Sequence, residues 1–158
     1  MSRTAAGRYY VSFRVDKSLL ALAEATGQIG IDLGLKTFAA FNDGTSHHAA
    51  RPLRRKMAQL KRAQKRLSRK RNWNKARIKV AKNHEKIADI RRDGLHKLTT
   101  DLVRKTHTIV IEDLNVRGMM ANHKIAGAVA DSAWGEFARQ LEYKCAWYGR
   151  ALIRISRW

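Results

Sequence analysis

Positive charge in this sequence is concentrated in one segment, which runs from Arg51 to Arg92. The segment holds 18 Lys or Arg and only two acids, Glu85 and Asp89, so it carries +16 of the chain's formal charge of +20. Charge of one sign at this density cannot be buried, and it repels itself unless a polyanion lies nearby. We therefore expect a solvent-exposed basic arm attached to a nearly neutral body.

The polyanion that suits such an arm is nucleic acid, with an anionic membrane surface as the alternative. No apolar run reaches the length of about 18 residues that a membrane span needs. The first twenty residues carry several basic side chains among polar ones, which is not typical of a signal peptide. Cys145 is the only cysteine, so the chain has no intrachain disulfide or cysteine-based zinc site, which fits a reducing cytoplasm. With nucleic acid as the partner, a nucleoid-associated cytoplasmic location is expected.

The arm is predicted to be an antiparallel helical hairpin within residues 51–106. Its first helix has a coiled-coil-like apolar spacing at Leu53, Met57, Leu60 and Leu67. Residues 72–74 should break that helix, and a second one should run from about residue 75 to residue 105. Gly94 lies inside the second helix, where a local kink is one expectation.

The outer faces of this hairpin are the candidate nucleic-acid interface. A helix stabilised by its own surface ion pairs would mix Glu with Lys, so phosphate contacts explain the one-sided charge better than a merely solvated face does. Trp73 either stacks on a base or plugs the tip of the hairpin. The candidate binding residues are Arg54, Arg55, Lys61, Arg62, Lys65, Arg66, Arg69, Lys70, Arg71, Lys75, Arg77 and Lys79.

The body predicts an α/β fold with alternating strands and helices. The expected strands are residues 9–15, Gln28–Leu33, residues 36–42, residues 45–50, residues 108–111 and Ala151–Ile155. A helix is expected over residues 132–148, because its apolar residues recur every three or four positions. Asp131 or Ser132 would cap its start, and Gly149 would end it.

Two of these strands deliver a carboxylate. Asp32 lies in the motif GIDLG, on the face opposite Ile31 and Leu33, and Glu112 ends the apolar run that begins at residue 108. If the two strands are neighbours, the carboxylates form one site, and hard cations such as Mg²⁺ choose carboxylate oxygens. For Asp32 alone, the alternative is a strand-end Asp that bonds a turn. For Glu112 alone, an acid at the end of a strand is unremarkable.

Other polar residues are less informative. The six histidines have no zinc-like spacing and are predicted to be surface or capping residues. Lys36 lies near Asp32 in sequence and could touch phosphate, although a surface lysine is the simpler interpretation.

Taken together, the motifs resemble those of a known family. GIDLGLK, a basic helical hairpin, IVIEDLNVRGM and WGEFARQLEYKCAWYGRALIRISRW follow one another in the order of the TnpB family, the transposon-encoded OrfB proteins. The resemblance spans roughly residues 7–158. It implies an RNase H-like, RuvC-type mixed sheet, with the basic hairpin inserted, and RNA-guided cleavage of DNA with Mg²⁺ or Mn²⁺.

By position, Asp32 and Glu112 match the family's first two catalytic acids, which are also metal ligands, whereas Asp113 is a motif neighbour. The resemblance also implies that residues 1–158 form a partial nuclease domain, without the family's N-terminal recognition region, zinc ribbon and third catalytic Asp. We therefore expect DNA and guide RNA as partners, a weakly held metal, little cleavage by the chain alone and self-association through exposed truncation surfaces.

Two other functions fit parts of the sequence. A non-cleaving nucleic-acid-binding protein or regulator derived from the same family would keep the arm without the chemistry. GIDLG also occurs in the actin and sugar-kinase fold, but that fold needs a second nucleotide-binding half and gives the basic arm no role.

Overall fold

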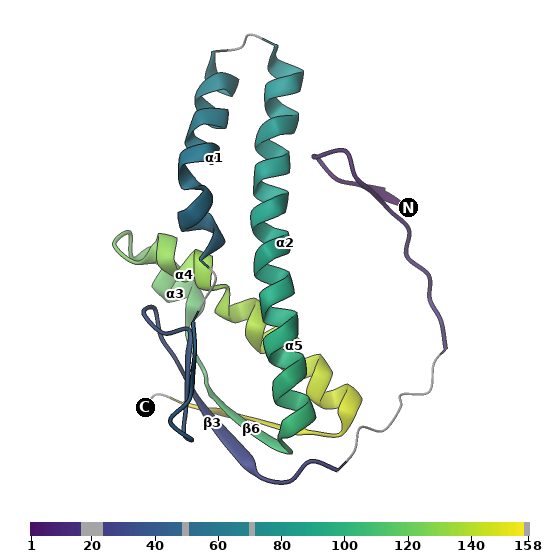
Figure 1. The fold of residues 1–158 in the computed structure, drawn as a ribbon, viewed down its shortest axis with the longest axis vertical. Coiled ribbons are helices and arrows are strands. Elements are labelled where there is room, and N and C mark those ends of the chain that lie inside the picture. The colour runs from purple at the N-terminus through teal and green to yellow at the C-terminus, as the bar shows by residue number, and fades with distance from the viewer. Residues whose placement is uncertain (17–23, 49–50, 70–71, 157–158) are drawn as a thin grey trace. The chain divides into compact units, whose positions relative to one another are not determined.

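The computed structural model of the chain describes residues 1–16, 24–48, 51–69 and 72–156 (Figure 1). It divides into two compact units. Unit 1 comprises residues 1–17 and 51–92, and unit 2 comprises residues 18–50 and 93–158. Helix α2 (Trp73–Lys105) contributes its first part to unit 1 and its last part to unit 2, and it is continuous through Gly94.

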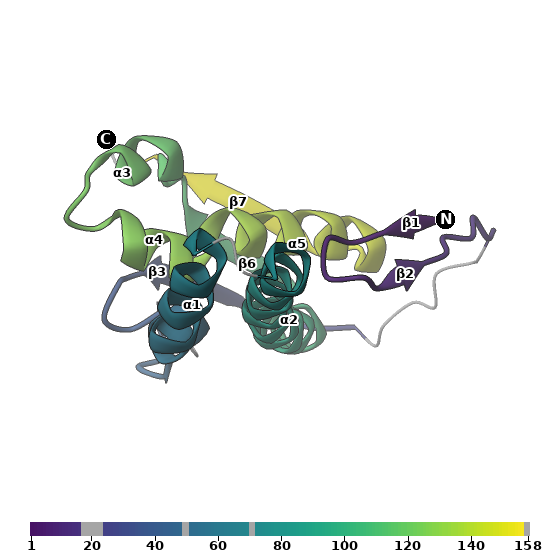
Figure 2. The ribbon, with the colours of Figure 1, turned by 90° about the horizontal axis from the view of Figure 1, so that it is seen from above.

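Unit 1 contains the basic arm. Helix α1 (Pro52–Ser68) begins at a proline, whose fixed φ and missing N–H suit the first turn of a helix. Helices α1 and α2 lie side by side and antiparallel (Figures 1 and 2). The hairpin prediction for the arm agrees with this arrangement, but α2 begins at Trp73, inside the segment 72–74 that was expected to break the helix.

The apolar spacing of α1 is only partly a packing surface. Leu60 is buried as expected, together with Pro52 and Ala63. Met57 is exposed, so the predicted coiled-coil-like seam is wrong at this position. The buried side of α1 is therefore narrower than its apolar spacing predicted.

The first predicted strand, residues 9–15, is largely absent. Strand β2 covers only Tyr9–Tyr10, and it pairs antiparallel with β1 (Ser2–Arg3). Alternating residues beyond Tyr10 are exposed, and Phe13 is 83% exposed. Alternation alone misled here, because a strand also needs a partner edge and a surface to cover.

Unit 2 is a mixed α/β structure built on a five-stranded sheet, in the order β5-β4-β3-β6-β7. Its strands are β3 (Gln28–Leu33), β4 (Ala39–Phe41), β5 (Ser46–His47), β6 (Thr108–Glu112) and β7 (Ala151–Ile155). Strands β3, β6 and β7 are mutually parallel, and β4 and β5 add an antiparallel edge. The central strands were predicted within a residue or two, whereas β4 and β5 are shorter than expected. Residues 49 and 50 of the predicted return strand lie outside the described residues.

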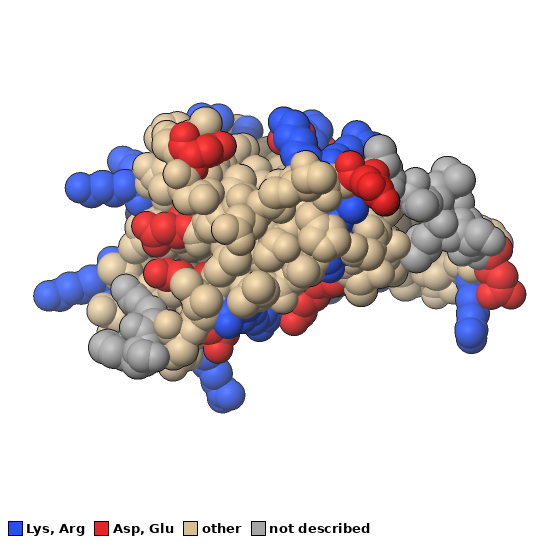
Figure 3. Space-filling view, turned by 90° about the horizontal axis from the view of Figure 1, so that it is seen from below, with Lys and Arg blue, Asp and Glu red and all other residues tan. Residues whose placement is uncertain are grey.

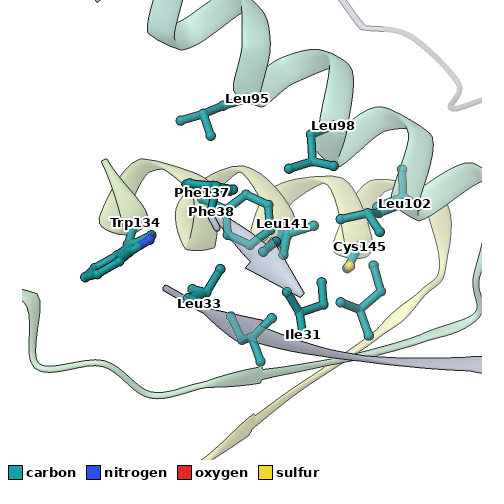
Figure 4. Close-up of a cluster of buried hydrophobic side chains, with 14 of the residues drawn as sticks. Ile31, Leu33, Phe38, Leu95, Leu98, Leu102, Trp134, Phe137, Leu141 and Cys145 are labelled. Atoms are coloured by element: carbon teal, nitrogen blue, oxygen red, sulfur yellow. The ribbon is translucent and has the colours of Figure 1, made fainter. Parts of the chain in front are cut away.

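Helix α5 (Trp134–Tyr148) and the last part of α2 cover one face of this sheet (Figure 4). Their buried apolar side chains in this core are Leu95, Leu98, Leu102, Val103, Trp134, Phe137, Leu141 and Cys145. Phe137 is fully buried and packs edge-on against Phe38, with ring centroids 5.3 Å apart. This core fixes the sheet from which the candidate site is built.

Two short helices, α3 (Val116–Ala121) and α4 (Ala126–Ser132), connect β6 to α5. Ala133 separates α4 from α5 with a left-handed φ of 54°, so α5 begins two residues later than predicted. The expected cap by Asp131 or Ser132 is wrong, because both residues belong to α4 and α5 has no side-chain cap. Gly149 ends α5 with φ 63°, as predicted.

The other face of the sheet is seen in Figure 3, where a mostly uncharged surface is bordered by acidic and basic side chains. On this face Ile153 and Ile155 of β7 are 47% and 49% exposed. Among the residues that the structure describes, no helix has the length and apolarity needed to cross a membrane.

Candidate metal site and nucleic-acid interface

Asp32 and Glu112 lie on adjacent parallel strands at the same level of the sheet. The pairing of β3 with β6 runs from Gln28 opposite Thr108 to Ile31 opposite Ile111, a constant offset in sequence. The next residues along the two strands are Asp32 and Glu112. Because successive side chains alternate between faces, both carboxylates project away from the helix-covered face. The structure thus brings together the two acids that the sequence singled out.

The exposure of the two acids fits a site that opens to solvent. Ile31 and Ile111, one position earlier, are buried in the core, whereas Asp32 is exposed and Glu112 is half-buried. On β7 the residue opposite Glu112 is Ile155, on the same uncovered face. Like charges on neighbouring strands repel, so this pair favours a bound cation.

The glycines on either side of Asp32 have local reasons. A side chain at Gly34 would place its Cβ 2.9 Å from the carbonyl oxygen of Thr37, which is too close. The N–H of Gly30 donates to Oδ1 of Asn42 at 3.2 Å, and the N–H of Asn42 donates to the Gly30 carbonyl at 3.1 Å. Gly34 therefore permits the tight turn after β3. From the sequence alone, this role could not be distinguished from leaving room for a ligand close to the backbone.

A cavity of about 350 Å³ lies beside the end of β6, and Glu112, Asp113 and Arg154 are among its lining residues. Nη2 of Arg154 donates to Glu142 at 2.6 Å, and its Nη1 lies 4.0 Å from Asp113. Asp113 is therefore directed to a surface ion pair of this cavity. This agrees with its interpretation as a motif neighbour of Glu112 and not as a third acid of the site.

The donor set suits a hard cation with few protein ligands. Mg²⁺ usually binds through one or two carboxylates and keeps several waters, which two strand-end acids can provide. Within the described ranges, no group of three or more His, Cys, Asp or Glu side chains is close enough to hold a metal ion. Asp131, Glu136 and Glu142 thus do not supply a third ligand beside Asp32 and Glu112.

Ten of the twelve candidate nucleic-acid-binding residues lie in the described part of the arm, and all ten are exposed. Lys70 and Arg71 lie outside it. Trp73 is 49% exposed, and the Arg77 guanidinium carbon lies 5.1 Å from the centre of its ring. The plug interpretation of Trp73 is therefore wrong, while stacking on a base stays a prediction.

One functional feature of the arm was missed from the sequence. Arg8, from the turn between β1 and β2, pairs with Glu85 and Asp89 of α2, the two acids of the arm. These residues are far apart in the chain, and no local pattern links them. Arg8 leaves the arm with even less exposed negative charge than its sequence suggests.

The histidines are mostly surface residues, as predicted, with two exceptions in unit 2. His47 is half-buried, and its ring lies edge-on to Phe38 with centroids 6.1 Å apart. Burial, together with the charge of His48, lowers the pKa of His47 below its ordinary value. The carbonyl of His96 accepts a hydrogen bond from Lys144 at 3.0 Å. Lys36 is exposed, in agreement with the simpler interpretation.

The fold and site define a mixed α/β protein that carries two strand-end carboxylates and a basic helical arm. Residues 10–123 match the sequence model of the OrfB family of IS605 elements, described as "Probable transposase". The chain belongs to this family, and the resemblance to TnpB proteins is thereby confirmed.

Curated relatives extend the similarity over the whole chain. The sequence is 44% identical over 162 residues to a "Putative RNA-guided DNA endonuclease" of Streptomyces pristinaespiralis, covering all of this chain and 40% of that protein. It is 31% identical over 169 residues to "Putative RNA-guided DNA endonuclease InsQ" of Escherichia coli, covering 94% of this chain and 42% of that protein. The chain thus spans about two-fifths of the length of these relatives.

Proposed function

We propose that this chain is the RuvC-type, RNase H-like part of a transposon-encoded RNA-guided DNA endonuclease, with residues 51–106 as an inserted nucleic-acid-binding arm. The observation that carries the proposal is the position of Asp32 and Glu112, side by side at the carboxyl ends of two parallel strands. Ligands of open α/β sheets gather at this edge. The names of the relatives in Streptomyces and Escherichia coli support the same activity.

In this proposal Asp32 and Glu112 hold a divalent cation, Mg²⁺ or Mn²⁺. Such a cation, when bound, polarises a phosphodiester and lowers the pKa of a water. Asp32 and Glu112 would hold the ion, and the packing of Ile31 and Ile111 in the core keeps the two strands in place. With two protein ligands, binding is weak and the chain alone cleaves DNA little or not at all.

The arm supplies affinity for DNA and guide RNA in this function. Its exposed Lys and Arg contact phosphates, which positions a strand without reading its sequence. A DNA partner also implies a place at the nucleoid. The second candidate function is a non-cleaving nucleic-acid-binding protein of the same family, and the absence of a third ligand among the described residues favours it for the chain in isolation.

Thermal unfolding with and without Mn²⁺ tests the metal site. Mn²⁺ at about ten times its Kd should stabilise the wild type by about 1.4 kcal/mol, because the ion binds only the folded state. Asp32→Asn and Glu112→Gln should each remove this stabilisation. Asp113→Asn is the matched control and should keep it. Equal stabilisation of all four proteins would exclude Asp32 and Glu112 as the ligands.

Two further measurements separate cleavage from binding. The logarithm of the binding constant for duplex DNA and for RNA should fall linearly with the logarithm of the salt concentration. For the duplex, each neutralised phosphate should add about −0.9 to the slope of this line. A salt-independent affinity would contradict the role of the arm. With Mg²⁺ and a matching guide, the isolated chain should bind without cutting, and robust cleavage lost in Asp32→Ala would instead establish it as a complete nuclease.

A further inference from the structure

A hollow lies between α1 and α2 in the basic arm and has a volume of about 270 Å³. It is lined by Gln59, Arg62, Ala63 and Arg66 of α1 and by Lys79 and Asn83 of α2. All of these residues belong to unit 1. The lining includes neither Asp32 nor Glu112, and the proposed metal chemistry gives the hollow no role.

The spacing of its lining residues makes the hollow a groove between two helix faces. Gln59, Arg62, Ala63 and Arg66 follow one another at intervals of three, one and three residues, so they form one face of α1. Lys79 and Asn83 are four residues apart and form one face of α2. Both faces line the same hollow, and α1 and α2 lie side by side in Figure 2.

Ala63 makes the groove possible. It is buried, 3% exposed, and it is the only residue of the lining with a side chain as small as a methyl group. The longer side chains of the lining therefore surround a depression over Ala63. Lys61, Lys65 and Lys75 are exposed cations of the same arm that are not among the lining residues of this groove.

The groove carries uncompensated positive charge. Its lining contains three cations and no acid, and the ion pairs of the described residues include none to Arg62, Arg66 or Lys79. The nearest acids in sequence, Glu85 and Asp89, are engaged by Arg8. Three like charges around one hollow repel each other, and an anion between them removes that cost.

We propose that this groove is a subsite for one phosphodiester of a nucleic-acid strand, held by Arg62, Arg66 and Lys79, with its sugar beside Gln59 and Asn83. The proposal rests on the arm binding nucleic acid, as proposed above. Arg forms paired hydrogen bonds to phosphate oxygens, and carboxamides bond phosphate and sugar oxygens in nucleic-acid complexes. The small volume suits one phosphate and its sugar better than a larger ligand.

The proposed subsite predicts that arm residues inside the groove contribute more to binding than equally charged arm residues outside it. If the arm binds only through its overall electrostatic field, every exposed cation should contribute about equally to nucleic-acid affinity. If the groove binds a phosphodiester, its three cations and two carboxamides should contribute more to affinity than neighbouring residues do. The experiment therefore compares residues inside the groove with matched residues on the same helices outside it.

The first comparison is Arg62→Ala against Arg55→Ala, since both remove one exposed arginine from α1. Binding of the full chain to fluorescent oligouridylate and oligodeoxythymidylate of equal length is measured over a range of salt. Arg62→Ala should weaken binding about tenfold, the loss of a charge-assisted hydrogen bond, and lower the salt slope by about 0.7. Arg55→Ala should weaken binding only about two- to threefold.

The second comparison keeps the charge constant. Gln59→Ala with Asn83→Ala should weaken binding about three- to tenfold with an unchanged salt slope, because only neutral hydrogen bonds are lost. Gln64→Ala with Asn74→Ala, on the same two helices outside the groove, should leave affinity unchanged. A larger loss for the RNA probe would assign the carboxamides to the 2′-hydroxyl, and an equal loss would assign them to atoms shared by both strands.

Failure of the subsite and failure of the nucleic-acid function give different results. If the wild type binds neither oligonucleotide at low salt, the proposed function is wrong and the groove loses its basis. If it binds both, but groove and control variants lose affinity equally, the proposed function stands and the subsite is wrong. Polyglutamate is the third probe, and if Arg62→Ala weakens its binding as much, the groove is a general anion site and the phosphodiester proposal is overturned.

Discussion

The guanidinium group of Arg8 binds Asp89 through Nη1, 2.8 Å from Oδ2, and its Nε lies 3.1 Å from Oε2 of Glu85. One side chain from the β1–β2 turn thus engages both acids of the segment Arg51–Arg92. The other oxygen of Glu85 is buried, and it has no hydrogen-bond partner among the described residues. The pairing ties the N-terminal strands to α2 and removes the negative charges that would oppose a bound polyanion.

Arg8→Ala should weaken the binding of RNA and DNA more than the loss of another exposed arginine does. The reason is that Glu85 and Asp89 lose their ion pairs with Arg8, and their negative charges then repel the bound polyanion. Arg14→Ala is the control, since it removes the same charge from an exposed residue with no regular structure. Hydrogen exchange of the β1–β2 amides should also become faster in Arg8→Ala only. Equal effects of the two substitutions on binding and exchange would show that the ion pairs have no such role.

Phe137→Ala should destabilise unit 2 by about 3–5 kcal/mol, because it leaves a cavity against Phe38 in a fully buried site. Chemical denaturation followed by circular dichroism measures the change. Met120→Ala, at an exposed position of α3, should cost less than about 0.5 kcal/mol. A small effect of Phe137→Ala would mean that the sheet and α5 do not depend on this contact.

Lys144 makes the stability of unit 2 depend on pH. Its ammonium group is buried and donates to Oγ1 of Thr99 and Oγ1 of Thr100, each at 2.7 Å, and to the His96 carbonyl, which are all neutral acceptors. Burial lowers the pKa of Lys144 below its ordinary value of 10.5. The unfolded chain therefore binds more protons just below that value, and the free energy of unfolding should rise with pH there.

Lys144→Met should remove this rise and leave stability at neutral pH equal or higher, because an apolar side chain of similar length avoids the cost of burying charge. Burial raises the pKa of the Cys145 thiol, which changes stability in the opposite sense near its ordinary value of 9.0. The informative quantity is therefore the difference between the two proteins at each pH. Identical pH profiles would contradict the assignment.

The uncovered face of the sheet should make the chain associate at high concentration. Ile153 lies opposite Val110 and Ile155 lies opposite Glu112, so two exposed isoleucines lie beside β6 on the edge strand β7. Sedimentation velocity should show association that decreases in Ile153→Thr with Ile155→Thr. If this double variant associates as strongly as the wild type, the association occurs through another surface, such as the exposed Val11 and Phe13 of unit 1.

Much of the local structure was determined by the sequence itself. The apolar runs that become β3 and β6, the three- and four-residue spacing of α5 and the glycine that ends it all follow from side-chain periodicity and backbone freedom. The charge of the arm is likewise independent of any fold. The two acids, Asp32 and Glu112, could be singled out because each follows or interrupts an apolar strand.

Only the tertiary structure decided which of these features meet. The parallel pairing that sets Asp32 beside Glu112 depends on how β3 and β6 share a core. The expected strand over residues 9–15 is cut to Tyr9–Tyr10, because only these two residues pair with β1. The left-handed Ala133 moves the start of α5, and the contacts of Arg8 and the groove over Ala63 join residues distant in sequence. Periodicity indicates which face of an element is apolar. It does not indicate which distant element packs against that face, because this contact depends on the residues of both elements.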